Sequence, residues 1–301
     1  MTLYRREARG LGAVEALTAL LLRQRAEGPL AGLYDAGDVQ WWWKDEWKDD
    51  ASPQAVRTWL WSDDTGADVA WARVAEKGGL DAATGRIDAD GGWLATAGEQ
   101  VVAAVVAALG VLPARSTRPV WTVSDERDEE LSDRLATIGF VRAPDQDFVQ
   151  MWQQPATPPA ALTLPIGFRF DDDRSRAPGR PHHLARRNGR DVAERLREVS
   201  LYRPDLDLCL RDADGTVAAY CLCWLDVANG VGLFEPVRTE DAYQRRGLGQ
   251  ALMAEGIRRL MERGARTIRV AREADNAASA ALYRRSGFAD AFRNLAWRRT
   301  S

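Results

Sequence analysis

The chain has 301 residues, a formal net charge of −3 and a hydrophobic content of 46%. This length and this apolar content suffice for two domains with separate cores, and disorder is not expected. The slightly acidic charge gives no broad positive surface, so the sequence does not predict nucleic acid as a partner. Any site for an anion must therefore be local.

Membrane spans and disulfides are not expected either. The first residues lack the apolar core of a signal peptide, and the most apolar run, residues 101–112, is too short to cross a bilayer. The three cysteines, Cys209, Cys221 and Cys223, are too few for a disulfide framework and lack partners at zinc-ligand spacing. Because Cys221 and Cys223 alternate along an expected strand, they share one face and favour core packing. We expect a soluble, cytoplasmic protein without a metal or a membrane partner.

The first half is expected to alternate helices and strands in a mixed α/β order. Apolar residues recur at helical spacing over residues 11–27, and Gly28-Pro29 ends that helix. The other expected elements are a hairpin at 56–74, a strand within 80–93, a helix at 96–109, a strand at 120–123, a helix at 129–138 and a strand at 148–152. Ten of the twelve tryptophans lie before residue 155, which favours an aromatic core or domain contact, with a ligand-stacking wall as the alternative.

The second half repeats this order. Its expected elements are a hairpin at 206–225, a strand at 231–239, a helix after that strand, a strand at 267–271 and a helix at 277–285. A proline-rich segment, residues 154–165, is the expected linker between a first domain at 1–153 and a second domain at 166–301.

Three landmarks keep a nearly constant distance between the two halves. Gly66 and Gly215 are 149 positions apart, and Val123 and Val270 are 147 apart. The dipeptides Gly139-Phe140 and Gly287-Phe288 are 148 apart. This spacing indicates an internal duplication.

The most informative stretch runs from Glu235 to Leu252. A turn at Gln244–Gly249 carries two glycines and is followed at once by an amphipathic helix. Such a turn leaves several N–H groups pointing one way, and a helix N-terminus binds phosphate through these groups and the helix dipole. The alternative is that the glycines serve packing alone and that Arg245 and Arg246 are solvated charges. On the first interpretation the turn binds a pyrophosphate.

Two motifs together resemble the GNAT superfamily of acetyl-CoA-dependent acyltransferases. The first is Q/R-x-x-G-x-G/A, matched by Gln244, Gly247 and Gly249, and the second is Asn276-x6-Tyr283-x3-Gly287-Phe288. The resemblance covers roughly residues 162–301, and the tandem layout resembles mycothiol synthase-like proteins. It implies two tandem GNAT-like domains, each a mostly antiparallel twisted sheet flanked by helices.

The resemblance also implies how acetyl-CoA, the acyl donor, is held. Main-chain N–H groups of the turn would bind the pyrophosphate, and the strand before it would align the pantetheine arm like an added strand. Tyr283 would give a proton to the departing thiolate, and the alternative is a helix residue with a surface hydroxyl. The implied cofactor-binding residues are Val237, Arg238, Thr239, Gln244, Arg245, Arg246, Gly247, Leu248, Gly249 and Asn276.

Glu235 is the candidate base that removes a proton from the acceptor amine. On an expected strand it shares a face with Val237 and Thr239, beside the thioester position. The alternatives are a charged residue at a strand end and a base relayed through water.

A charged tract, Asp171–Arg190, lies where this family usually builds acceptor-binding helices. The tract could attract an acidic acceptor, but a solvated face is the favoured interpretation. His182 and His183 lie within it and lack a second set of ligands, so a metal site is not expected.

The first half has lost the expected site residues. An offset of 148 places Thr96–Val101 at the position of the glycine turn, with Glu99 in place of Gly247. The same offset pairs Asp128 with Asn276 and Leu135 with Tyr283. We therefore expect one cofactor per chain and a first half that supports the fold or forms one wall of the acceptor pocket.

The expected function is transfer of an acetyl group from acetyl-CoA to a primary amine of a small molecule, by direct attack in a ternary complex. One alternative is a CoA-binding sensor without turnover, and another is acetylation of a protein. The acceptor, the acyl-chain preference and the oligomeric state are not predicted.

Overall fold

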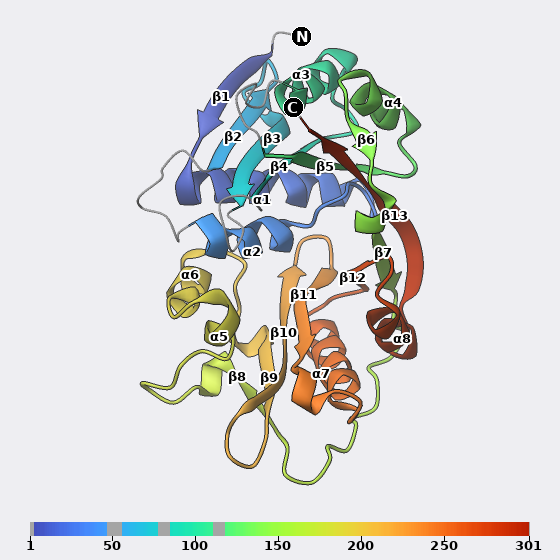
Figure 1. Cartoon of the computed structure of the whole chain (residues 1–301). Helices are drawn as coiled ribbons and strands as arrows, with labels where there is room; N and C mark the ends of the chain where they lie inside the picture. Colours follow the sequence, from blue (N-terminus) through green and yellow to red (C-terminus); the bar gives the residue numbers. More distant parts are fainter. Residues whose placement is uncertain (1–2, 47–55, 78–84, 111–117, 301) are drawn as a thin grey trace.

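The computed structural model describes residues 3–46, 56–77, 85–110 and 118–300, and Figure 1 shows two halves stacked on one another. The first half contains β1 (Tyr4–Ala8), α1 (Gly10–Ala26), α2 (Ala36–Glu46), β2 (Val56–Ser62), β3 (Asp68–Lys77), β4 (Arg86–Trp93), α3 (Glu99–Gly110), β5 (Val120–Asp125), α4 (Glu129–Thr137), β6 (Val141–Arg142) and β7 (Phe148–Gln153). Residues 154–168 then contain no helix or strand.

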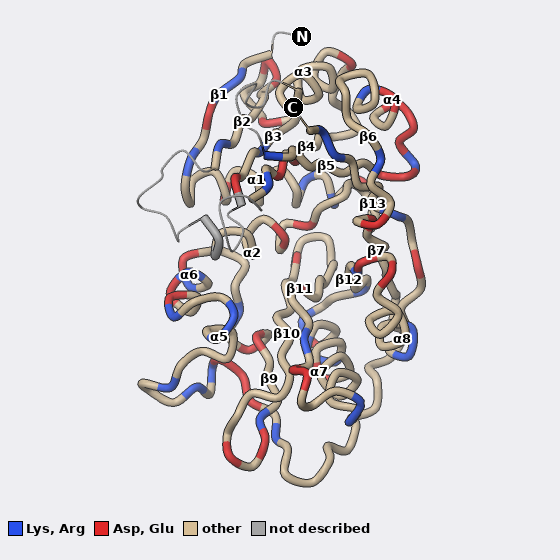
Figure 2. The backbone as a smooth tube through the Cα atoms, viewed as in Figure 1, with Lys and Arg blue, Asp and Glu red and all other residues tan. Residues whose placement is uncertain are grey.

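The second half contains β8 (Arg169–Asp172), α5 (Ala185–Asn188), α6 (Val192–Glu198), β9 (Asp207–Arg211), β10 (Val217–Asp226), β11 (Val231–Thr239), α7 (Leu248–Glu262), β12 (Thr267–Glu273), α8 (Ala277–Arg285) and β13 (Ala289–Arg299). The hairpins and helices expected from the sequence are present in both halves. The charged residues of both signs are interspersed along the chain (Figure 2). No helix within the described ranges is long and apolar enough to cross a bilayer.

The strands form one mixed sheet that runs through both halves. Its order is β1-β2-β3-β4-β5-β13-β7-β12-β11-β10-β9-β8, with β6 paired to β13. Only β4–β5 and β11–β12 are parallel among the described pairs, which confirms the mostly antiparallel fold. Read inward from β1 and inward from β8, the strands of the two halves follow the same order. The exception is the last strand of each half, which lies in the sheet of the other half. β7 of the first half pairs with β12, and β13 of the second half pairs with β5.

The duplication is visible in the backbone. Gly66 and Gly215 both take positive φ, 81° and 85°, at the tips of equivalent hairpins. Gly139 and Gly287 have φ of 88° and 92° after equivalent helices, where a residue with a Cβ would be strained. Phenylalanines follow both of these glycines and are buried. The same turns therefore end the same elements in each half.

The two parallel strand pairs separate before they end. β11 pairs with β12 only from Val231 to Phe234, although β11 continues to Thr239. β4 pairs with β5 only at Ile87 and Asp88, although β4 continues to Trp93. Beyond these points each half contains a wedge-shaped opening between strands, lined by main chain that the neighbouring parallel strand leaves unpaired.

The helices cover the two faces of the second-half sheet differently. α7 and α8 pack on one face, over a core that includes Cys221 and Cys223, which confirms that these cysteines share a buried face. The other face is covered by α6 together with α1 and α2 of the first half. Figure 1 shows α1 and α2 lying across the border between the halves. First-half side chains are therefore close to β11.

Candidate active site

The turn after β11 has a backbone suited to binding an anion. Arg245 has φ of 61° and is the only described residue other than glycine with positive φ, and Gly247 follows with φ of 78°. Gly247 is the N-cap of α7, and no side chain at this position caps the helix. Alternating left-handed and right-handed residues point successive N–H groups into one concavity, and the helix dipole adds positive potential there. The turn can bind a phosphate without any particular side chain.

Gly249 is closely packed against its neighbours. A Cβ at this position would lie 3.2 Å from Thr239 Oγ1 and 3.3 Å from Leu282 Cδ2. The start of α7 therefore lies directly against the end of β11 and against α8. In contrast, a Cβ at Gly247 would meet no atom within 4 Å, so that glycine serves the backbone conformation alone.

The polar side chains near the turn hold its shape. Gln244 Nε2 donates to Asp241 Oδ1 at 3.2 Å, and Arg238 Nη2 donates to the same oxygen at 3.1 Å. The Arg246 guanidinium lies 5.6 Å from the centre of the Tyr243 ring. These contacts leave the main-chain N–H groups as the anion-binding surface of the turn.

Tyr283 lies on α8, the helix that packs against the start of α7, with its ring in the core. It is 6% exposed, and its ring centre is 6.1 Å from that of Phe288. Burial, followed by the charges of Glu235 and Cys221, raises the pKa of the Tyr283 hydroxyl. The hydroxyl therefore keeps its proton at neutral pH and is able to donate it.

Asn276 has a structural contact of its own. Its Oδ1 accepts a hydrogen bond from Ser279 N at 3.0 Å and caps the start of α8. Asp128 does the same for α4, accepting from Leu131 N at 2.8 Å. The two caps are equivalent in the duplicated halves.

Glu235 lies at an irregular point of β11. The expectation that it shares a strand face with Val237 and Thr239 is wrong. The register against β10 shifts by one residue, because Cys223 faces Phe234 while Cys221 faces Val237. Phe234 and Val237 consequently both contact the core beneath α7, and the strict alternation on which the expectation rested is interrupted at Glu235 and Pro236.

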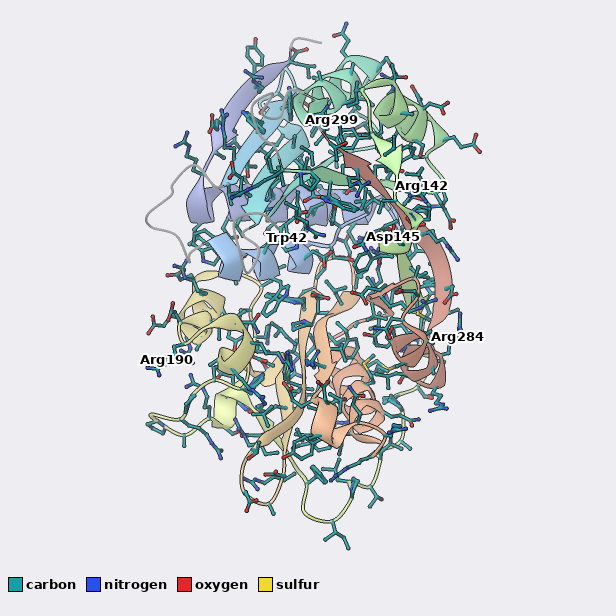
Figure 3. All side chains as sticks on the ribbon, in the orientation of Figure 1. Trp42, Arg142, Asp145, Arg190, Arg284 and Arg299 are labelled. Atoms are coloured by element: carbon teal, nitrogen blue, oxygen red, sulfur yellow. The ribbon has the colours of Figure 1, made fainter. Side chains whose placement is uncertain are left out.

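Glu235 instead lines a cavity of about 250 Å³ between the two halves. Most of the other walls come from the first half, including Trp42, which lies near the border in Figure 3. Its aromatic and acidic residues are Tyr34, Asp38, Trp42, Asp88, Asp90, Trp121, Phe148 and Glu235, and we name it the acceptor cavity for the role proposed below. Only Glu235 among them was a site residue expected from the sequence, although the first half is visibly rich in aromatic and acidic residues.

Asp38 brings a second carboxyl group to the acceptor cavity. It lies on α2, and its Oδ2 accepts a hydrogen bond from Asp35 N at 2.7 Å. Burial raises the pKa of Asp38 to about 8, with further contributions from the charges of Asp35 and Glu235. Asp38 and Glu235 come from opposite halves and repel one another's negative charge, which is an arrangement that favours a bound cation.

The equivalent turn of the first half lacks the anion-binding geometry. None of the residues 94–99 has a positive φ. Glu99, at the start of α3, forms an ion pair with Arg134 of α4. Leu135, which occupies the position of Tyr283, is fully buried and carries no hydroxyl.

The charged tract before β9 is in part the expected solvated face, because Arg174, Arg186, Arg187 and Arg190 are exposed. In contrast, Asp172, Asp173, His182 and His183 are buried. Asp172 pairs with Arg259 at 2.8 Å, while Asp173 pairs with Arg176 and Arg197.

The two histidines have a partner that the sequence analysis did not identify. Asp207 Oδ1 lies 2.7 Å from His183 Nε2, and Asp207 Oδ2 lies 2.9 Å from His182 Nε2. Burial alone would lower the pKa of His183, but the charge of Asp207 and the hydrogen bond to it raise this pKa to about 10. Burial alone would raise the pKa of Asp207, but the charge of His183 and the hydrogen bonds with both histidines lower it. His183 and Asp207 therefore form a buried ion pair.

A splayed strand, an anion-binding turn and a buried tyrosine define a GNAT-type domain, and residues 171–288 match the Acetyltransferase (GNAT) family. The second half of the chain thus carries a domain of this family. Two curated relatives, from Clavibacter michiganensis subsp. michiganensis and Clavibacter sepedonicus, are each named mycothiol acetyltransferase. Each is 38% identical over 109 residues, which is 36% of this chain and 35% of the relative. The match therefore spans about a third of the length of either relative.

Solved structures resemble the whole chain. A tandem GNAT protein from the clavulanic acid biosynthesis pathway has a TM-score of 0.65 at 17% identity, covering 99% of this chain and 98% of that one. A GCN5-related N-acetyltransferase from Sphaerobacter thermophilus has a TM-score of 0.59 at 18% identity, covering 99% and 95%. These likenesses support the tandem GNAT fold.

Proposed function

We propose that this chain is an acetyl-CoA-dependent N-acetyltransferase that acts on a primary amine of a small molecule. The observation that carries the proposal is that the turn at Arg245–Gly249 lies against the end of β11 and against α8, the helix that carries Tyr283, in the segment that matches the GNAT family. A sensor without turnover has no need of a buried, protonated tyrosine on that helix.

The donor is bound chiefly by main chain in this proposal. Residues Arg245–Gly249 bind the pyrophosphate, and Val237, Arg238 and Thr239 align the pantetheine arm through groups that β12 leaves unpaired. Asn276 fixes the start of α8 beside the same opening. Acetyl-CoA supplies the thioester that is attacked.

The acceptor occupies the cavity between the halves. Its ammonium group is attracted by Glu235, and by Asp38 where the pH is high enough to ionise that carboxyl, and its body contacts the aromatic walls. Glu235, directly or through a water, removes a proton and frees the nitrogen lone pair. The nitrogen bonds to the acetyl carbonyl carbon, the carbon–sulfur bond breaks, and the Tyr283 hydroxyl protonates the leaving thiolate. The nitrogen releases its second proton to solvent as the amide forms, and the tyrosinate regains a proton from solvent.

A small acceptor fits the size of the cavity better than a protein does. The volume of about 250 Å³ admits a small molecule or one side chain, and both halves enclose it. The name of the two curated relatives also supports a small-molecule acceptor.

Release of free thiol from acetyl-CoA, measured against a panel of small amines, tests the proposal. Wild-type protein should turn over at least one amine. Glu235→Gln should be slow and should lose the acidic limb of the rate profile, whereas Tyr283→Phe should be slow and keep it. An unchanged acidic limb in Glu235→Gln removes this residue from the mechanism. Tight CoA binding without turnover on a broad panel would favour the sensor instead.

A further inference from the structure

The first half contains a cavity that the proposed reaction does not use. It has a volume of about 560 Å³ and lies in the opening where β4 separates from β5. Its walls come from the end of β4, the segment between α1 and α2, and the start of α4. We call it the first-half cavity. It occupies the place in the first half that the pantetheine opening occupies in the second.

The charge around the first-half cavity is wrong for a pyrophosphate. Its carboxylates are those of Glu27, Asp125, Asp128, Glu129 and Glu130. Among the described residues, Arg127 is the only basic residue that lines it, and its guanidinium is paired with Asp125, while Arg134, outside the lining, pairs with Glu130. Because the adjacent turn also has no residue with positive φ, the site repels an anion and attracts a cation.

The inner wall of the cavity is aromatic. Tyr34, Trp71 and Trp93 line it together with Leu131. Trp71 is fully buried, and its indole Nε1 has no hydrogen-bond partner among the described residues. This nitrogen lies 2.9 Å from where a Cβ of Gly92 would be, on the strand that borders the opening. An acceptor atom on a ligand would satisfy a donor that the protein leaves unpaired.

Tyr34 separates the first-half cavity from the acceptor cavity, since it lines both. Its ring packs edge-on against Trp42 at 5.2 Å and against Trp71 at 5.7 Å. Its hydroxyl donates to Asp90 Oδ1 at 2.6 Å. The ring is thus held from three sides, and the two cavities are separate compartments.

We infer that the first-half cavity is a second ligand site, which binds a small organic cation with an ammonium group on an aromatic or alkyl body that also carries a hydrogen-bond acceptor for Trp71 Nε1. The cationic head lies near Glu129 and Glu130 at the start of α4, and the body lies against Trp71 and Trp93. Attraction between a cation and both the aromatic faces and the carboxylates is the basis of recognition. The inference is independent of the proposed transferase activity, because it concerns binding alone.

Calorimetric titration of the full chain with acetylcholine, which has a quaternary ammonium group and a carbonyl acceptor, tests this inference. This probe has no N–H bond and cannot be acetylated on nitrogen. We expect one site per chain, with an affinity that falls as salt is added. Glu129→Gln combined with Glu130→Gln should weaken binding about tenfold, because two nearby charges are removed.

Matched variants locate the site. Asp133→Asn removes an exposed charge from the same helix outside the cavity and should change the affinity less than twofold. Glu27→Gln, on a different segment, should weaken binding if the α4 double variant proves unstable. Loss of binding in Glu235→Gln, with binding retained in the α4 variant, would place the probe in the acceptor cavity and overturn the inference. Absence of binding, or displacement of the probe by a second CoA, would also overturn it.

Discussion

Arg269 of β12 and Asp35, which precedes α2, form a buried ion pair across the two halves, with 3.0 Å between Arg269 Nη1 and Asp35 Oδ2. Asp35 also pairs with Arg25 at 2.9 Å. Burial lowers the pKa of Arg269 to about 10, so the guanidinium stays charged at neutral pH and needs its partner. One carboxylate therefore neutralises two buried arginines from different halves.

Replacing Asp35 with Asn should lower the free energy of unfolding by about 3–5 kcal/mol, because two buried guanidinium groups lose their anion. Urea unfolding followed by circular dichroism measures this change. Arg258→Gln is the control, since Arg258 forms exposed pairs with Glu255 and Glu262 on α7. That variant should lose no more than about 1 kcal/mol. Equal losses in the two variants would contradict the importance of the buried pair.

Gly247→Ala should weaken CoA binding about tenfold, because the positive φ costs an alanine about 1–2 kcal/mol and shifts the N–H groups of the turn. Gly98→Ala is the matched change in the first half. Gly98 has no positive φ, and a Cβ there meets no atom within 4 Å. Titration should give one CoA per chain in wild type and in Gly98→Ala. Two CoA molecules per chain would contradict the loss of the first-half site.

Tyr283→Phe should lower kcat by about 10²- to 10⁴-fold with little change in KM for acetyl-CoA. The ring packs against Phe288, so phenylalanine keeps the packing and removes only the proton donor. Tyr4→Phe, at an exposed position of β1, is the control and should have the wild-type rate. Steady-state kinetics at neutral pH provide the measurement. Full activity in Tyr283→Phe would assign protonation of the thiolate to another group or to water.

Affinity for the acceptor amine should depend on Asp38 near pH 8. The raised pKa leaves the Asp38 carboxyl largely protonated at pH 7, and it gains a charge as the pH rises through about 8. KM for a given amine should then fall in wild type relative to Asp38→Asn, in which position 38 stays neutral. Comparing both proteins with the same amine cancels the titration of the amine itself. Parallel KM profiles would show that Asp38 does not contact the ammonium group.

The His183–Asp207 pair should make stability depend on pH in the alkaline range. The pKa of His183 in the folded protein is about 10, above its ordinary value of 6.5. Its contribution is therefore complete below pH 6.5 and is lost as the pH rises toward 10, a loss of up to about 5 kcal/mol. The free energy of unfolding, measured with urea at pH 6.5 and at pH 9.5, should change more between these two pH values for wild type than for His183→Gln. Equal differences would mean that the buried histidine is neutral.

The repeat and the motifs were predictable from the sequence because each depends on local spacing. Glycines at turns and the Asn276-to-Gly287 spacing predict where elements end, independently of contacts with the rest of the chain. In contrast, α2 was not predicted, because Trp41, Trp42 and Trp43 are consecutive and form no helical stripe.

Features that depend on contacts between distant residues were not predictable. The shift of register at Glu235 depends on how β10 pairs with β11, and strand alternation alone gave the wrong face. The meeting of Asp38 with Glu235 joins residues almost two hundred positions apart. No local pattern indicates that α2 of one half covers β11 of the other.

The exchange of β7 and β13 has a consequence for how the chain can be cut. Because the last strand of each half is bonded into the sheet of the other, a break in residues 154–168 would not release two folded pieces. Each fragment would expose the edge of its sheet, because the strand that pairs with that edge in the intact chain would belong to the other fragment. The two fragments should be insoluble when made separately and should reassemble when made together. The acceptor cavity, whose walls come from both, is thus fixed by a continuous sheet and not by a hinge.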